Sequence, residues 1–187
     1  MEIEIKLRLA DGLAPIRRKL RECGFRIVER RMLEDNLLLD TRDSSLATQG
    51  KLLRVRRVGR HHVLTYKGPA QPGRHKRRPE IETSIEDGGA LQQILELVGF
   101  RPAFRYEKFR TEYAQPSGAG KVMLDETPIG NFLEIEGAAR WIDQTARRLG
   151  FAHSDYITAS YGRLYIDYCR ERGRTPTNML FPNRGGR

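Results

Sequence analysis

Apolar and charged residues alternate at the start of the chain. Isoleucine or leucine occupies every odd position from 3 to 9, and glutamate, lysine or arginine occupies every even position from 2 to 8. Because successive side chains of an extended strand point to opposite faces, this period of two predicts a strand with one aliphatic face and one charged face. Such a strand ordinarily turns its charged face to water and its aliphatic face to a core.

Periodicity along the rest of the chain, together with glycines that end helices, predicts the other elements. The predicted strands cover residues 2–9, 25–40, 51–58, 62–68, 78–85, 103–114, 120–126 and 131–137. The predicted helices cover residues 12–23, 87–98, 138–149 and 158–171. Several connections between strands are short, which suits antiparallel neighbours, and eight antiparallel strands can close into a barrel that holds one small ligand.

The chain has no internal repeat and no linker that would divide it. We therefore expect one domain over residues 1–172, which is a suitable length for a single core. Residues 173–187 contain prolines and a Gly-Gly pair but no periodic pattern. They are predicted to form a C-terminal tail that runs over the surface.

Charged residues return in pairs spaced two apart, with an apolar residue between them. The pairs after the first strand are Arg54 with Arg56, Glu80 with Glu82, Lys108 with Arg110, and Glu134 with Glu136, and Lys67 and Asp125 end two other strands. If these faces are solvated, cross-strand pairing contributes only a few tenths of a kcal/mol per pair. Solvated faces usually include Ser, Thr and Gln, however, and these do not. The alternative is an inverted barrel, with the charges in its lumen and helices over its aliphatic outer face.

Composition narrows the classes of partner. Lys and Arg number 34 against 24 acidic residues, and the formal charge of +10 predicts a polyanionic partner: nucleic acid, an acidic membrane surface or a small phosphorylated ligand. Cys23 and Cys169 are too few for a disulfide framework or a zinc site, which favours reduced thiols and the cytoplasm. No stretch approaches about 18 apolar residues, and the N-terminus has no export signal, so no membrane partner is expected.

Seven blocks make the chain resemble the CYTH superfamily, also called triphosphate tunnel metalloenzymes. This superfamily includes class IV adenylyl cyclases, thiamine triphosphatases and inorganic triphosphatases. The blocks are EIEIK (2–6), which matches the ExExK signature, LRVR (53–56), YKGP (66–69), EIE (80–82), EKFR (107–110), LDETPIGNFLEIEG (124–137) and SYGRL (160–164). The resemblance implies an α+β fold: a closed eight-stranded antiparallel β-barrel, or tunnel, with flanking helices and a charged lumen.

The basic and the acidic residues of such a lumen are expected to bind different parts of a ligand. A triphosphate carries about four negative charges, which guanidinium forks and ammonium groups can bind. The residues placed for this are Arg54, Arg56, Lys67, Lys108 and Arg110. Carboxylates would repel the same ligand unless a cation intervened, so they are candidate ligands of Mg²⁺ or Mn²⁺. These carboxylates are Glu2, Glu4, Glu134 and Glu136.

The resemblance implies more specific roles. It assigns Glu2, Glu4 and Glu136 to the metal, with Asp125 and Glu134 near a second ion. It adds Lys6 to the phosphate-binding residues, although Lys6 could instead pair with a neighbouring glutamate. We expect Lys6, Lys108 and Asp125 to act in catalysis. Glu80 and Glu82 remain open between holding a basic side chain, orienting the attacking water and simple ion pairing.

Other polar residues are expected to lie outside the site. The basic stretch GRHKRRP, with basic residues at 74–78, is predicted to be a solvated loop. The histidines lie outside the charged pairs, so zinc is not expected. They are His61, His62, His75 and His153.

Three functions remain open from the sequence. A triphosphate hydrolase is favoured, because every identifiable site residue addresses phosphates or metal and none addresses a base. A class IV adenylyl cyclase, which converts ATP to cyclic AMP and pyrophosphate, uses the same residues. A non-catalytic binder of polyphosphate or nucleic acid ranks third, since acids accompany the basic strands and no nucleic-acid module is recognisable. A homodimer is left open.

Overall fold

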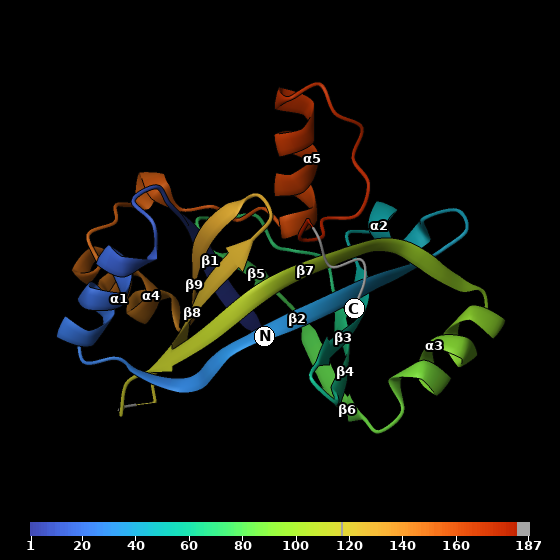
Figure 1. The fold of residues 1–187 in the computed structure, drawn as a ribbon, viewed down its shortest axis with the longest axis horizontal. Helices are drawn as coiled ribbons and strands as arrows, with labels where there is room; N and C mark the ends of the chain where they lie inside the picture. Colours follow the sequence, from blue (N-terminus) through green and yellow to red (C-terminus); the bar gives the residue numbers. More distant parts are fainter. Residues whose placement is uncertain (117, 183–187) are drawn as a thin grey trace.

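The computed structural model describes residues 1–116 and 118–182, which form one antiparallel sheet flanked by helices (Figure 1). Within these residues the sheet has nine strands in the order β5-β1-β9-β8-β7-β2-β3-β4-β6. Their bounds are β1 Glu2–Leu9, β2 Arg26–Thr41, β3 Leu52–Val58, β4 His61–Lys67, β5 Lys76–Arg78, β6 Glu80–Ile85, β7 Phe100–Ala114, β8 Gly120–Thr127 and β9 Gly130–Gly137. The predicted antiparallel α+β fold is confirmed.

The two ends of this order are halves of one extended segment. β5 pairs with β1 and β6 pairs with β4, and only Pro79 separates β5 from β6. Proline has no N–H to donate to a ladder, so it interrupts the strand predicted over residues 78–85. Pro79 still accepts a backbone bond of 2.9 Å from the N–H of Gly68. The segment 76–85 therefore joins both edges of the sheet, and the sheet wraps around a tunnel.

The helices cover the outside and one end of the tunnel. Their bounds are α1 Leu13–Glu22, α2 Ser45–Thr48, α3 Gly88–Leu97, α4 Ala139–Arg148 and α5 Tyr161–Glu171, with a 3₁₀ turn η1 at His153–Asp155. The four predicted helices are present, whereas the short α2 and η1 were not predicted. In Figure 1, α1 and α4 lie together beside β1, β9 and β8. Among the described residues no helix combines the length and apolar character needed to cross a membrane.

The main hydrophobic core lies outside the tunnel. Ile5 of β1 and Leu133 of β9 are fully buried, and they belong to the same apolar cluster as Leu20 of α1 and Ile142 of α4. The aliphatic faces of the strands thus pack under the helices, and the charged faces point inward. The ordinary arrangement, with charges in solvent, is excluded for β1 and β9.

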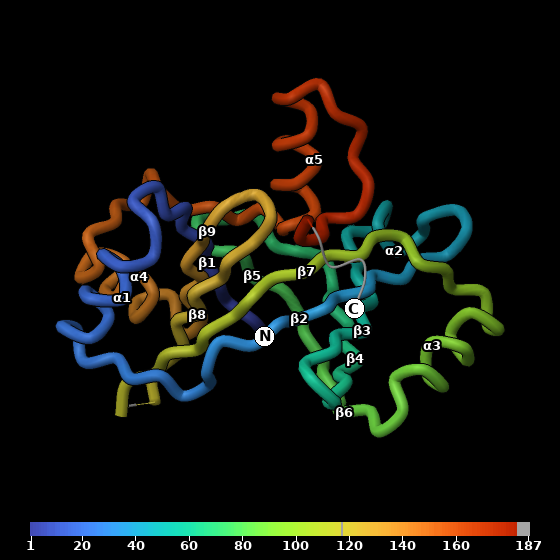
Figure 2. The backbone as a smooth tube through the Cα atoms, viewed as in Figure 1, coloured from blue at the N-terminus to red at the C-terminus, as the bar shows by residue number. Residues whose placement is uncertain are grey.

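A second apolar cluster closes over one part of the sheet. It contains Tyr106, Phe132, Tyr161 and Met179, all buried. Met179 belongs to the tail, which turns back from α5 toward β7 (Figure 2). Its N–H donates to the carbonyl of Arg105, and its own carbonyl accepts from the N–H of residue 107. The prediction of a tail that runs over the surface is therefore wrong at Met179, and residues 183–187 lie outside the described part of the chain.

We expect Leu133→Ala to lower the free energy of unfolding by about 2–5 kcal/mol, because it leaves a cavity between the barrel wall and the helices. Leu97→Ala is the control, since Leu97 is 88% exposed, and it should change stability by no more than about 0.5 kcal/mol. Urea unfolding monitored by circular dichroism measures both. Equal losses would contradict a core placed outside the tunnel.

Candidate active site

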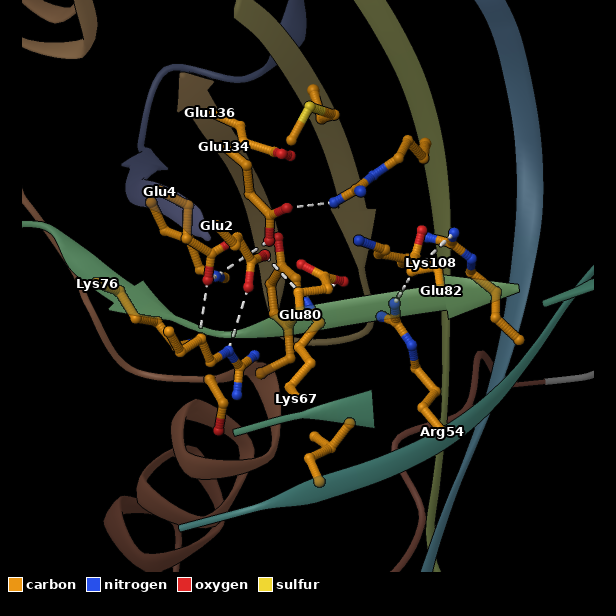
Figure 3. A pocket seen from close by; sticks show the side chains of 18 of the residues that line it. Glu2, Glu4, Arg54, Lys67, Lys76, Glu80, Glu82, Lys108, Glu134 and Glu136 are labelled. Carbon is orange, nitrogen blue, oxygen red and sulfur yellow. Dashed lines mark hydrogen bonds and ion pairs between the residues drawn. The ribbon is translucent and has the colours of Figure 1, made fainter. Parts of the chain in front are cut away.

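The tunnel encloses a cavity of about 440 Å³ that is lined mainly by charged side chains (Figure 3). Every predicted site residue except Asp125 lines it. These residues are Glu2, Glu4, Lys6, Arg54, Arg56, Lys67, Glu80, Glu82, Lys108, Arg110, Glu134 and Glu136. In Figure 3 the acids of β1 and β9 lie on one side of the cavity, and Arg54 and Lys108 lie on the other.

Strand alternation and register bring the acids together. β1 and β9 are neighbours in the sheet, and their register sets Glu4 beside Glu136 and Lys6 beside Glu134. Directly opposed residues of an antiparallel pair have Cβ atoms about 4.5–5.5 Å apart on the same face. A period-two charge pattern in two paired strands therefore produces a dense cluster of buried charge.

Two ammonium groups neutralise Glu4. Its Oε1 accepts hydrogen bonds from Lys6 Nζ at 3.0 Å and from Lys76 Nζ at 2.9 Å. Lys6 Nζ also lies 3.2 Å from an oxygen of Glu134. Burial opposes ionisation of Glu4, but Lys6 and Lys76 together hold the pKa of this carboxyl well below its usual range. Glu4 is thus ionised near neutral pH although it is only 5% exposed.

Glu2 has a similar arrangement at the next level of the lumen. Lys67 Nζ donates to Glu2 at 2.7 Å, and Arg78 Nε donates to its other oxygen at 3.2 Å. Lys67 Nζ also lies 2.9 Å from Glu80. Burial and the nearby Glu2 together raise the pKa of Glu80 to about 7, against the opposing attraction of Lys67. Glu80 is therefore an acid that can exchange a proton near neutral pH.

The roles of Glu82 and Glu80 differ. Glu82 Oε1 accepts from Thr65 at 2.7 Å, from Arg54 at 3.2 Å and from Arg56 at 3.4 Å. These donors lower the pKa of Glu82 against the effect of burial. Of the three possibilities left open by the sequence, Glu82 fits the one in which it holds basic side chains in place.

Asp125, which was expected to act in catalysis and to lie near a second ion, lies behind Lys108 and Arg110. Its carboxylate is fully buried and accepts from Lys108 at 2.9 Å, from Arg110 Nε at 2.7 Å and from the Tyr161 hydroxyl at 2.7 Å. It does not line the cavity, so this position does not support direct participation in a reaction. Its contacts instead fix Lys108 and Arg110, which do line the cavity.

The expectation of a solvated loop at residues 74–78 is wrong for three of its residues, because His75, Lys76 and Arg78 are buried. Lys76 and Arg78 are only 7% and 8% exposed and belong to β5, where they line the cavity, whereas Arg77 between them is exposed. The same spacing of two continues into Glu80 and Glu82, which is the signal that the sequence analysis missed.

Two further lining or neighbouring residues were also missed. Glu34 of β2 is buried within 3.4 Å of Lys108 Nζ, and Lys108 with the nearby arginines lowers its pKa to about 2 despite its burial. Tyr161, in the predicted SYGRL block, faces the cavity, with Lys6 and Lys108 over its ring at 5.3 and 5.1 Å from the centroid. Both were missed because neither belongs to a pair of charged residues spaced two apart: Glu34 lies in a strand of mixed composition, and Tyr161 begins a helix.

Carboxylate oxygens are the ligands that a hard divalent ion prefers, although most of the carboxylates in the cavity are paired with basic side chains. Among the described residues no three carboxylate, histidine or cysteine side chains converge as a metal-binding group. The Glu136 carboxylate makes no hydrogen bond or ion pair with the described residues, and burial together with Glu2 and Glu4 raises its pKa. A carboxylate left without a cation among other acids is a suitable first ligand for Mg²⁺ or Mn²⁺. No histidine lines the cavity in the described part of the chain.

Comparisons with known proteins point to the same fold. The CYTH domain model matches residues 1–154. A Methanocaldococcus jannaschii protein, provisionally named adenylate cyclase, is 29% identical over 136 residues, which are 73% of this chain and 76% of that protein. A solved Pyrococcus horikoshii structure is 27% identical with a TM-score of 0.77, covering 90% of this chain and 99% of that one. A Vibrio parahaemolyticus structure, also provisionally named adenylate cyclase, shares the fold at 20% identity, with a TM-score of 0.76 over 87% and 96% of the two chains.

We expect Lys76→Met and Arg78→Met each to destabilise the protein by about 1–3 kcal/mol, because each leaves a buried carboxylate with one donor fewer. Arg77→Met is the matched control in the same strand, and because Arg77 is exposed it should cost no more than about 0.5 kcal/mol. Urea unfolding at pH 7 compares the three variants. Losses of no more than about 0.5 kcal/mol from all three substitutions would place all three side chains in solvent.

Proposed function

This chain belongs to the CYTH domain family, and from that premise we propose that it is a divalent-metal-dependent hydrolase of inorganic or small organic triphosphates. The observation that carries the proposal is the cavity of the tunnel, in which basic side chains face a cluster of carboxylates. Basic groups alone would suit any polyanion. Their combination with buried acids suits a phosphate chain that arrives with a divalent cation.

The basic residues would bind the phosphate chain. Arg54 and Arg56 are held by Glu82, and Lys108 and Arg110 are held by Asp125, so their side chains are fixed before any ligand enters. Preorganised donors stabilise the charge that develops on phosphoryl oxygens without reorganising during the reaction. The two acids that hold them would therefore contribute to binding without touching the substrate.

The metal would be held by the acids of β1 and β9. Glu2, Glu4 and Glu136 are the proposed ligands, with Glu134 beside them. A bound Mg²⁺ or Mn²⁺ supplies neutralisation of phosphoryl oxygens and a fixed orientation for the phosphate chain. Lys6 and Lys76 both donate to Glu4, so these ammonium groups would become available to phosphate oxygens if Glu4 bound a divalent cation instead.

Glu80 is our candidate for the group that accepts the proton of the attacking water. The water oxygen bonds to the terminal phosphorus, the bridging P–O bond breaks, and its electron pair leaves with the remaining phosphate chain. The released proton passes to the Glu80 carboxylate, whose pKa of about 7 is well matched to this task near neutral pH. Glu82, which three donors surround, is much less suited to it.

Cyclisation of ATP is the second candidate, and one observation favours it. Leu38, Leu52 and Tyr106 line the cavity, and the Tyr106 ring stacks on Phe104 with centroids 5.8 Å apart. An apolar and aromatic wall suits the organic part of a ligand. Relatives provisionally named adenylate cyclase support this reading. A Hippeastrum protein of the same provisional name, 20% identical with a TM-score of 0.62, is described as having a dominant triphosphatase activity.

We expect purified protein with Mn²⁺ to release orthophosphate from tripolyphosphate faster than from ATP, and to form no cyclic AMP. Separate incubations with tripolyphosphate, thiamine triphosphate and ATP, followed by chromatographic separation of the products, measure this. Excess chelator should abolish turnover, because the acids of the cavity then have no divalent cation to screen them from phosphate. Cyclic AMP and pyrophosphate as the main products from ATP would establish the cyclase instead. Tight tripolyphosphate binding without turnover would indicate a binding protein.

We expect Glu80→Gln to lower kcat by about 100-fold or more, because glutamine cannot accept the proton. In the unaltered protein, kcat/KM should fall as the pH drops through about 7, where Glu80 becomes protonated. Glu112→Gln is the control, since Glu112 lines the cavity and, among the described residues, its side chain pairs with Lys121 alone, at 3.2 Å. An unchanged acid limb in Glu80→Gln, with full activity, would remove Glu80 from the reaction.

A further inference from the structure

Three side chains from separate segments meet outside the tunnel. His75 precedes β5, Asp143 lies in α4, and Tyr156 follows η1. His75 Nε2 lies 2.8 Å from Asp143 Oδ1, and the Tyr156 hydroxyl donates to the same oxygen at 3.0 Å. The rings of His75 and Tyr156 are 5.9 Å apart between centroids. None of the three lines the cavity, so their arrangement is not explained by ligand contact.

The two segments that Asp143 joins cover the same edge of β1. β9 pairs with one edge of β1, and β5 pairs with the other edge at residues 2–4. Ile157, the neighbour of Tyr156, continues along that second edge, where it exchanges two backbone hydrogen bonds of 2.9 Å with Lys6. Through His75 and Tyr156, Asp143 therefore connects both pieces of chain that complete the wall of the tunnel beside Glu4.

His75 is the first buried side chain of the segment that leads into β5. Residues 70–74 are exposed, whereas His75 is only 8% exposed. Lys76 comes directly after it, with Nζ 2.9 Å from Glu4, and Arg78 reaches Glu2 at 3.2 Å. Because β5 has only three residues, its own ladder bonds give it little independent stability. The position of Lys76 therefore depends on the anchor that precedes it.

We propose that His75, Asp143 and Tyr156 form a positioning cluster that sets Lys76 and Arg78 against the carboxylates of the cavity. The expected consequence of this positioning rests on the proposed function: the cluster would set the relative affinities of the cavity for metal and for phosphate. An ammonium group on Glu4 occupies an oxygen that a divalent ion would use, and it adds positive charge for a phosphate. A loosened anchor should therefore favour the metal and disfavour the phosphate, whereas general destabilisation would weaken both.

The first test compares His75→Phe with His153→Phe. Phenylalanine keeps a ring beside Tyr156 but cannot bond to Asp143. His153 is the control, because its Nε2 lies 3.5 Å from the same Asp143 oxygen but it is not in the segment that carries Lys76. Isothermal titration calorimetry with Mn²⁺ alone and with tripolyphosphate alone measures both affinities. In His75→Phe we expect tripolyphosphate affinity to fall about 5- to 10-fold and Mn²⁺ affinity to rise about 3-fold or more, with little change in His153→Phe.

A double-mutant cycle separates positioning from a merely structural role. If His75 acts through Lys76, the loss of tripolyphosphate affinity from His75→Phe should shrink to less than about 2-fold in a Lys76→Met background. Full additivity of the two substitutions, or a fall in both affinities in His75→Phe, would overturn the proposal. Tyr156→Phe, which removes only one hydroxyl, takes the place of His75→Phe in the cycle if that variant fails to fold.

Hydrogen exchange tests the proposal independently of ligand binding. Mass spectrometry of His75→Phe should show faster amide exchange in peptides covering residues 71–78, where the Gln71 N–H donates to the Arg77 carbonyl at 2.7 Å. Peptides from β7 and β8 should be unchanged. If the unaltered protein neither binds nor hydrolyses tripolyphosphate, the proposed function fails, and the exchange result still decides whether His75 anchors the segment. Unchanged exchange at residues 71–78 would refute the anchor whatever the protein binds.

Discussion

Pairing of buried charges inside the lumen is the constraint on which the rest of this structure depends. An isolated ionised group in a protein interior is so costly that it either neutralises itself or is removed by evolution. Here acids and bases enter the lumen together, so Glu4 is met by two ammonium groups and Asp125 by three donors. With the charged faces turned inward, the aliphatic faces must be covered from outside, and α1 and α4 do this against β1 and β9. The inverted barrel and its helices are thus two consequences of one arrangement.

Because of this pairing, the basic side chains of the lumen neutralise its carboxylates without any bound ion. A buried ion pair gains little net stability, because the desolvation of both groups offsets most of their attraction. Replacing the ionic partners of Glu4, Lys6 or Lys76 by those of a ligand therefore costs less free energy than burying any of these charges without a partner. A ligand that brings both negative phosphate and positive metal can satisfy the bases and the acids at once, which neither component can do alone. This accounts for why a cavity of both charge classes suits a metal-bound triphosphate better than either ion separately.

The period-two pattern predicted the strands and the lumen residues from Glu2 to Glu136, because alternation and sheet register are dictated by local geometry. The helices were predicted from their own periodicity and from the glycines that end them. The period-two pattern failed where a single residue interrupts it: Pro79 divides one strand, so Lys76 and Arg78 resembled a basic loop. The pattern could not show that Asp125 lies behind Lys108 and Arg110, because alternation predicts which face of a strand a side chain is on but not whether that side chain reaches the cavity. Met179 was missed for a further reason, because its burial depends on where α5 ends and how the tail returns.

Glu80 and Glu82 show how far the environment, rather than the sequence, determines a role. They share a strand, a face and a residue type, yet among the described residues Glu82 accepts from three donors and Glu80 from Lys67 alone. Donors lower the pKa of Glu82, and burial raises that of Glu80 to about 7. The difference arises because Thr65 and the arginines of β3 lie beside Glu82, while Glu80 lies next to Pro79, at the point where the sheet closes. The closure that interrupts the ladder thus also leaves one acid with few donors, and this is the acid best suited to exchange protons.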